Sequence, residues 1–144
     1  MSNSISIFTD GACRGNPGPG GWGVLILLEG EEISLYGGEN STTNNQMEMM
    51  AAIKALEYFQ ETTAIELVTD SSYLKDGIEK WIHGWKKNGW KTSAKKPVKN
   101  QELWMKIDVL NQFHEVQWKW VKGHSGHREN EIADLLANKG IDEL

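Results

Sequence analysis

The chain has 144 residues and a formal net charge of −5 at pH 7, and 39% of its residues are hydrophobic. This is the size of one ordinary domain with a real core, and the composition excludes a disordered or membrane-embedded chain. A single cysteine, Cys13, excludes an internal disulfide and a thiolate-rich metal site. The first residues contain no basic n-region and no long apolar segment, so we expect no signal peptide and a cytoplasmic protein.

Three strands are predicted in the first third of the chain. Residues 4–10 alternate around apolar side chains, and the turn-rich segment 15–21 follows them. Residues 22–28 and 32–37 are joined by a short polar connection, and we expect them to pair as an antiparallel hairpin.

Helices and strands alternate in the rest of the chain. Thr43 begins a helix, because Gln46 stands three positions later, as in a capping box, and an apolar stripe follows. The order of all elements predicts an α/β fold in which a mixed sheet carries helices on its faces. A crossover through the Thr43 helix would return the strand at 65–69 parallel to the first strand. The further predicted elements are a strand at 65–69, a helical stretch over 73–82, a helix over 103–110, a strand at 116–120 and a helix from about 127 to 139 that Gly140 ends.

A basic segment lies within this acidic chain. Residues 80–99 contain seven lysines and no acidic residue, so this window carries +7 and the rest of the chain carries −12. Such a patch can bind phosphates, because contacts respond to the charge within a Debye length of about 8 Å. The other interpretation of the lysines is a solvated face without a partner.

Two predicted strands end in the same way. Asp10 ends the strand at 4–10, and Asp70 directly follows the strand at 65–69. If these strands are parallel neighbours, the two carboxylates lie close together at the carboxyl edge of the sheet, where open α/β sheets bind their ligands. Taken singly, each aspartate also fits a turn or a helix cap.

Two further acids stand in unusual positions. Glu48 lies one turn into the Thr43 helix, although by itself it also fits an exposed helix face, and Asp134 interrupts the apolar run 132–137. Convergence of four acids is costly, since two unit charges 4 Å apart repel by about 4 kcal/mol at an effective dielectric constant of 20. A hard divalent cation relieves that repulsion, and an all-oxygen ligand set favours Mg²⁺ or Mn²⁺ over zinc.

Several segments together carry a resemblance to a known family. They are Phe8-Thr9-Asp10-Gly11, Gly15-Asn16-Pro17-Gly18, Thr43-Asn44-Asn45-Gln46-Met47-Glu48, Val68-Thr69-Asp70-Ser71 and Val121-Lys122-Gly123-His124-Ser125-Gly126-His127, followed by Asn130 and Asp134. In this order, over nearly the whole chain, they resemble type 1 ribonuclease H, and residues 81–90 are similar to the basic protrusion of its bacterial members. The resemblance implies a single catalytic domain over 1–144 with a mixed five-stranded sheet, helices on both faces and a basic helical protrusion at about 80–99.

The resemblance also implies a reaction. Members of the family hydrolyse the RNA strand of RNA–DNA hybrids and leave 3′-hydroxyl and 5′-phosphate ends. His124 is implied in proton transfer, which suits an ordinary histidine pKa of about 6.5. Two Mg²⁺ ions, for which Mn²⁺ can substitute, would activate the attacking water and stabilise the leaving oxygen. Carried over by position, their ligands are Asp10, Glu48, Asp70 and Asp134.

Further residues are implied as contacts to the hybrid, and we expect a monomer with no membrane partner. They are Cys13, Asn16, Thr43, Asn44, Asn45, Ser72, Trp85, Lys86, Lys87, Lys96 and Lys99. Turn formation and capping stay open for the asparagines and Thr43, and core packing for the tryptophans. Ala12 and Ser72 depart from the commoner bacterial pattern of Ser and Gln.

Two other functions compete with this interpretation. A non-catalytic module that binds hybrids or double-stranded RNA would need the lysines and asparagines but not the four acids. Another metal-dependent nuclease with the same fold would act on DNA junctions or ends. The presence of all four acids favours an enzyme.

Overall fold

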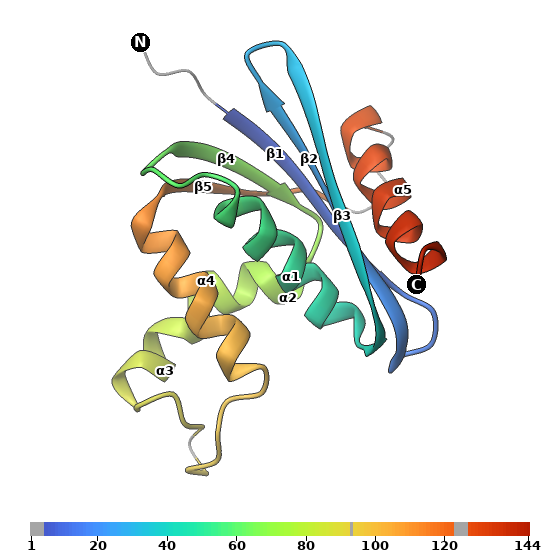
Figure 1. The fold of residues 1–144 in the computed structure, drawn as a ribbon. Coiled ribbons are helices and arrows are strands. Elements are labelled where there is room, and N and C mark those ends of the chain that lie inside the picture. The colour runs from blue at the N-terminus through green and yellow to red at the C-terminus, as the bar shows by residue number, and fades with distance from the viewer. Residues whose placement is uncertain (1–4, 93, 123–126) are drawn as a thin grey trace.

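A five-stranded mixed sheet organises the chain (Figure 1). The computed structural model describes residues 5–92, 94–122 and 127–144. The strands lie in the order β3-β2-β1-β4-β5. The elements are β1 (Ile5–Cys13), β2 (Gly18–Leu28), β3 (Glu31–Thr42), α1 (Asn44–Glu57), β4 (Ala64–Thr69), α2 (Ser72–Asp76), the π-helical turn η1 (Gly77–Trp81), α3 (Ile82–Lys87), α4 (Gln101–Phe113), β5 (Glu115–Trp120) and α5 (Arg128–Asp142).

The strand pairing agrees with the predicted topology. Strands β1, β2 and β3 are antiparallel, whereas β4 pairs in parallel with β1 on one side and β5 on the other. The register sets Phe8 opposite Val68, so β1 and β4 run side by side towards the same edge. The predicted parallel alignment of these two strands is therefore confirmed, and it determines where the acids after them lie.

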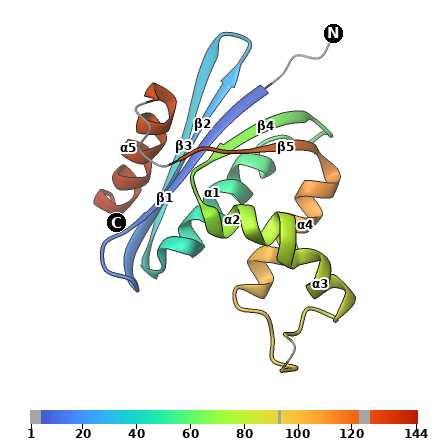
Figure 2. The same cartoon turned by 180° about the vertical axis from the view of Figure 1, so that it is seen from behind.

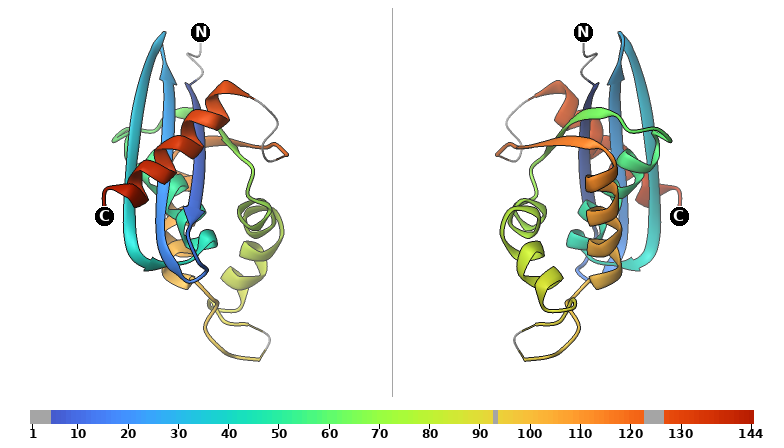
Figure 3. Two further views of the ribbon diagram at one scale, coloured as in Figure 1. Left: turned by 90° about the vertical axis from the view of Figure 1, so that its right-hand side faces the viewer. Right: turned by 90° about the vertical axis from the view of Figure 1, so that its left-hand side faces the viewer.

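Helices cover both faces of the sheet, as expected. Helix α5 lies on one face, and α1, α2 and α4 lie on the other (Figures 1 and 3). Alternate side chains of β1 and β2, such as Ile7 and Val24, form the core with the apolar stripe of α1, to which Ile53 and Leu56 belong. Within the described residues, no helix is long and apolar enough to cross a membrane.

Helix α5 approaches the sheet unusually closely. The prediction that Gly140 ends this helix is wrong, because α5 continues to Asp142 and Gly140 is buried inside it. A Cβ at Gly140 would clash with the backbone carbonyl of Gly37 in β3, so glycine is needed here for backbone contact rather than for a helix end. Two surface ion pairs hold the ends of α5, at 2.7 Å each: Arg128 to Glu32, and Arg14 to Asp142.

The basic segment projects from the body of the molecule. The chain leaves through η1 and α3 and returns along an irregular segment to α4 (Figures 1 and 2). Trp85 packs against Trp81, Trp90 and Trp104, with ring centroids 5.6–6.4 Å apart. The predicted packing of Trp81 and Trp85 at the base of the protrusion is confirmed, although only the part of 80–99 up to Lys87 is helical.

Candidate active site

Three carboxylates converge at the carboxyl ends of β1 and β4. Asp10 lies on β1, Asp70 directly follows β4, and Glu48 comes from α1. Each offers one carboxylate oxygen, and these three oxygens lie within 4.8 Å of one another. The sequence-based expectation that these acids come together is therefore met by the geometry.

Glu48 is buried rather than exposed. It is only 5% exposed, because α1 packs so closely on β1 that a Cβ at Gly11 would clash with the backbone nitrogen of Glu48. Its Oε1 atom has no hydrogen-bond partner among the residues that the structure describes. A buried carboxylate oxygen without a partner is costly, and a cation at the cluster would satisfy it. The residues present therefore fit a metal ion.

Asp134 joins the cluster from the opposite face of the sheet. It lies on α5, and a side-chain hydrogen bond links it to Asp10. The close approach of α5 to the sheet brings this acid to the edge that the other three occupy. The four predicted acids therefore interact, although they come from β1, α1, the end of β4 and α5. Asp10, Glu48 and Asp70 form the tight group, and Asp134 acts on Asp10 and Glu48 from beside it.

Burial and mutual repulsion raise the pKa values of two acids in this cluster. They raise the pKa of Asp10 to about 8, first through burial and then through the charges of Asp70 and Asp134. The Gly11 backbone N–H, which donates to Asp10 Oδ1 at 2.9 Å, lowers that pKa in part. Burial, followed by repulsion from Asp10 and Asp70, holds the pKa of Glu48 well above its usual range. The site therefore retains protons near neutrality unless a cation takes their place.

A second group of predicted residues gathers at the start of α1. Thr43 caps the helix, since its Oγ1 accepts from Gln46 N at 3.2 Å, and Asn16 Oδ1 accepts from Asn44 N at 3.0 Å. The Cys13 thiol donates to the Gly15 carbonyl nearby. Asn44 and Asn45 are exposed. The structure therefore brings the β1–β2 connection and the first turn of α1 together in one polar surface.

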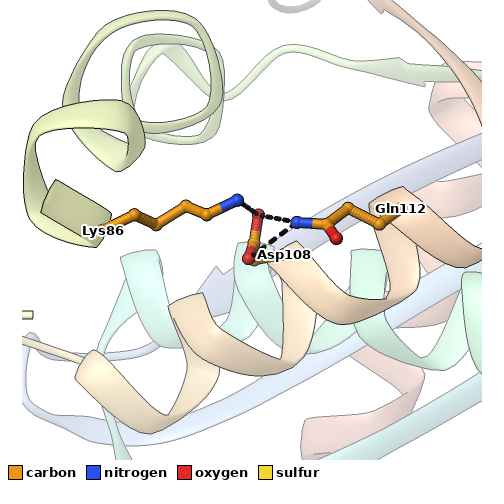
Figure 4. A network of polar contacts seen from close by, with 3 residues as sticks. All are labelled: Lys86, Asp108 and Gln112. Carbon is orange, nitrogen blue, oxygen red and sulfur yellow. Dashed lines mark hydrogen bonds and ion pairs between the residues drawn. The ribbon is translucent and has the colours of Figure 1, made fainter. Parts of the chain in front are cut away.

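Other predicted contacts lie on the protrusion. Lys87, Lys96 and Lys99 are exposed, whereas Trp85 is half-buried in the aromatic cluster. Lys86 differs from these lysines, because its Nζ lies 3.3 Å from Asp108 Oδ1, which also accepts from Gln112 (Figure 4). The ion pair partly neutralises the charge of Lys86 and connects α3 to α4.

The remaining predicted residues are one serine and two histidines. Ser72 is exposed at the start of α2, two residues after Asp70. His124 lies outside the described residues. His114 is structural, as expected, because its ring is buried between the Leu56 carbonyl, 2.9 Å away, and the Thr63 N–H, 3.1 Å away.

Sequence reasoning missed three side chains next to these groups. The indole N–H of Trp120 donates to the carbonyl of Asp70 at 3.2 Å, which helps to hold the acid at the end of β4. Gln46 and Asn100 bond to each other at 3.0 Å and line a surface cavity of about 390 Å³. For Trp120, its position on the strand beside β4 is the one sequence feature that could have indicated the contact with Asp70. Gln46 and Asn100 are 54 residues apart, so no local sequence pattern indicates their bond.

The arrangement is that of a metal-dependent enzyme with an acidic centre and a basic arm. The RNase H family model matches residues 2–142. The chain is 58% identical over 144 residues to ribonuclease H of Pseudomonas fluorescens, covering all of this chain and 96% of the relative. It is 61% identical over 141 residues to that of Mesorhizobium japonicum, covering 98% and 80%.

Solved structures agree with these relatives. LC9-RNase H1, a type 1 RNase H with the type 2 active-site motif, superposes with a TM-score of 0.87 at 31% identity, over 99% of this chain and 74% of that one. LC11-RNase H1, solved in complex with an RNA/DNA hybrid, gives 0.73 at 28% identity, over 96% and 97%. The chain therefore belongs to the ribonuclease H family, and it is a metal-dependent endoribonuclease.

The repulsion in the cluster predicts that removal of one charge stabilises the metal-free protein. The pKa of Asp10 is about 8 in the folded state, against an ordinary value of 3.8. Protonation of Asp10 therefore stabilises the folded state; this stabilisation is full below about pH 4 and is lost as the pH rises through 8. In EDTA we expect Asp10→Asn to gain little at pH 5 and about 1–3 kcal/mol at pH 8, measured by urea unfolding. Mg²⁺ should narrow the gap, because it binds the intact site and stabilises only the wild type strongly.

The control is Asp142→Asn, which removes an exposed acid that pairs with Arg14 and should give no stabilisation at either pH. An Asp10→Asn protein that is less stable in EDTA at both pH values, with an unchanged response to Mg²⁺, would show that Asp10 is a structural cap.

Proposed function

We propose that the chain hydrolyses the RNA strand of RNA–DNA hybrids by two-metal-ion catalysis and leaves 3′-hydroxyl and 5′-phosphate ends. The observation that carries the proposal is the convergence of Asp10, Glu48 and Asp70, which Asp134 joins through its interaction with Asp10. It includes a buried oxygen of Glu48 that has no hydrogen-bond partner among the described residues. The similarity to LC11-RNase H1, which was solved with a hybrid, supports the choice of substrate.

The proposed metal is Mg²⁺, with Mn²⁺ as a substitute. The ligands offered are carboxylate oxygens alone, the donors that hard divalent cations prefer. When bound, two such ions would lower the pKa of the attacking water and stabilise the leaving oxygen. Asp10 interacts with the other three acids, and it would therefore be the central ligand for bound metal.

The protein's own residues bind and orient the substrate in this proposal. Asn16, Asn44 and Asn45 form the exposed polar surface at the start of α1, suited to the 2′-hydroxyls that distinguish RNA from DNA. The capped helix start at Thr43, together with Cys13, borders that surface. Ser72 is assigned to the same substrate face beside Asp70. His124 is proposed to transfer a proton to or from the reacting phosphate.

The protrusion is proposed to hold the phosphates of the hybrid. Its support is the charge of +7 over residues 80–99, carried on an arm outside the acidic body. Lys87, Lys96 and Lys99 would contribute more than Lys86, which already faces Asp108. Trp85 offers an aromatic face at the base of the arm.

Residues 1–144 are proposed to form one catalytic domain that works as a monomer in the cytoplasm. The unpaired Cys13 agrees with a reducing compartment. A binding module without activity is disfavoured, because such a module has no use for four mutually repelling acids.

The proposed reaction predicts a strict substrate pattern. With Mg²⁺, the chain should cut internally in the labelled RNA strand of a hybrid, leave the DNA strand intact, and lose activity in EDTA. End analysis of the products should find 3′-hydroxyl and 5′-phosphate groups. The comparison substrates are double-stranded RNA, double-stranded DNA and both single strands; comparable cutting of double-stranded DNA would indicate the other nuclease class.

The proposed role of the protrusion predicts a change in binding rather than in chemistry. Replacing Lys87, Lys96 and Lys99 together by Ala should weaken hybrid binding and leave the rate at saturating substrate nearly unchanged. The slope of log K against log salt should become shallower by roughly one for each phosphate that no longer has a lysine partner.

The matched control replaces the same number of charges outside the protrusion, at Lys54, Lys106 and Lys139 on α1, α4 and α5. It should affect binding much less. Equal effects of the two triple variants on affinity and salt slope would reduce the protrusion to a solvated basic face.

A further inference from the structure

One side chain, that of Tyr73, contacts both places where the protrusion joins the body of the protein. The hydroxyl oxygen of Tyr73 accepts hydrogen bonds from Asn100 Nδ2 at 3.1 Å and from Trp104 Nε1 at 3.2 Å. Its ring packs edge-on against Trp81, with centroids 5.7 Å apart. Trp81 lies where the chain leaves for the protrusion, and Asn100 lies where it returns. Tyr73 therefore contacts both ends of the arm.

Tyr73 is itself fixed relative to Asp70. It belongs to α2, which begins shortly after the acid and is capped by Ser71, whose Oγ accepts from Leu74 N at 3.2 Å. Only Ser71 and Ser72 stand between the acid and the tyrosine in this short, capped segment. The position of the acid and that of the tyrosine hydroxyl are thus set by the same piece of backbone.

The contact extends on the other side to the polar surface at the start of α1. Asn100 Oδ1 accepts from Gln46 Nε2 at 3.0 Å, and Gln46 Oε1 accepts from Thr42 Oγ1 at 2.8 Å. Asn100 has a positive φ of 60°, which asparagine tolerates, and both ends of its side chain are bonded. The return of the protrusion is therefore held between α1 and α2 by side-chain hydrogen bonds.

We propose that Tyr73 is a positioning residue that fixes the protrusion relative to the four acids. Through Asn100, Trp104 and Trp81 it sets the distance between the lysine contacts and the phosphodiester that is cut. This inference rests on the proposed function, because it assumes that the protrusion binds the hybrid. Tyr73 acts on substrate placement and not on metal binding, since its hydroxyl bonds go to Asn100, where the protrusion returns, and to Trp104 in the helix α4 that follows.

The test is Tyr73→Phe, which keeps the ring contacts and removes the acceptor of two donors. KM for the hybrid should rise about 3- to 10-fold, as expected for the loss of about one hydrogen bond's worth of positioning, while kcat stays nearly constant. The salt dependence of binding should become shallower, and the Mg²⁺ dependence of the rate should not change. The matched control is Tyr36→Phe, which removes a hydroxyl that donates to Glu143 beside the end of α5 and should keep the wild-type KM.

A double-mutant cycle separates positioning from general destabilisation. In a chain that already carries Lys87, Lys96 and Lys99 as Ala, Tyr73→Phe should raise KM much less than it does in the wild type, because the lysine contacts that Tyr73 places are gone. A residue that serves stability alone would lower the free energy of unfolding without this coupling. A wild-type KM and salt slope for Tyr73→Phe, or fully multiplicative effects in the cycle, would overturn the inference.

Failure of this inference and failure of the proposed function would give different results. A wild-type chain that leaves hybrids uncut would end the proposed function itself, whereas hybrid cleavage weakened by the lysine variant but unaffected by Tyr73→Phe would end only the role of Tyr73. If Tyr73→Phe does not fold, Asn100→Gly removes one of the two donors to the Tyr73 hydroxyl, and glycine tolerates the positive φ of this position. The same cycle then applies, with coupling expected and multiplicative effects overturning the inference.

Discussion

Electrostatic repulsion among four carboxylates at one edge of the sheet is the constraint on which the candidate site depends. Glu48 is buried, and Asp10, Asp70 and Asp134 are half-buried. Burial of Asp10 and Glu48 removes much of the water that would otherwise screen their charges. A folded chain carries this cost only if the fold forces the acids together, because the unfolded chain keeps them apart. The same repulsion makes the site a strong attractor for cations.

Close backbone packing is what forces the acids together. Gly11 lets α1 lie against β1, and Gly140 lets α5 lie against β3, so Glu48 and Asp134 arrive from opposite faces of the sheet. The parallel pairing of β1 with β4 brings Asp70 beside Asp10, and the indole N–H of Trp120 helps to hold Asp70 there. The same elements place the polar surface and Tyr73, since α1 carries the exposed asparagines and α2 carries Tyr73.

Most of this arrangement is predictable from the sequence where one local rule determines the structure. The capped start of the helix at Thr43 and the strands before Asp10 and Asp70 follow from short-range patterns, and the segments that resemble ribonuclease H point to all four acids. Long-range backbone contact is not readable in this way, which is why the local pattern wrongly predicts a helix end at Gly140. The bonds of Tyr73 and Trp120 escape prediction for the same reason, because their partners are 27 to 50 residues away along the chain.

The most direct test of an acidic centre built for metal ions is the number of protons released when Mg²⁺ binds. With the pKa of Asp10 at about 8, the metal-free site holds close to one proton on this group at pH 7, and the ion must displace it. Calorimetric titration with Mg²⁺ at pH 7, in buffers of different ionisation enthalpy, measures that release. We expect about one proton or more per wild-type chain and a clearly smaller number for Asp10→Asn. Tight Mg²⁺ binding without proton release, equal in the two proteins, would mean that the ion binds elsewhere.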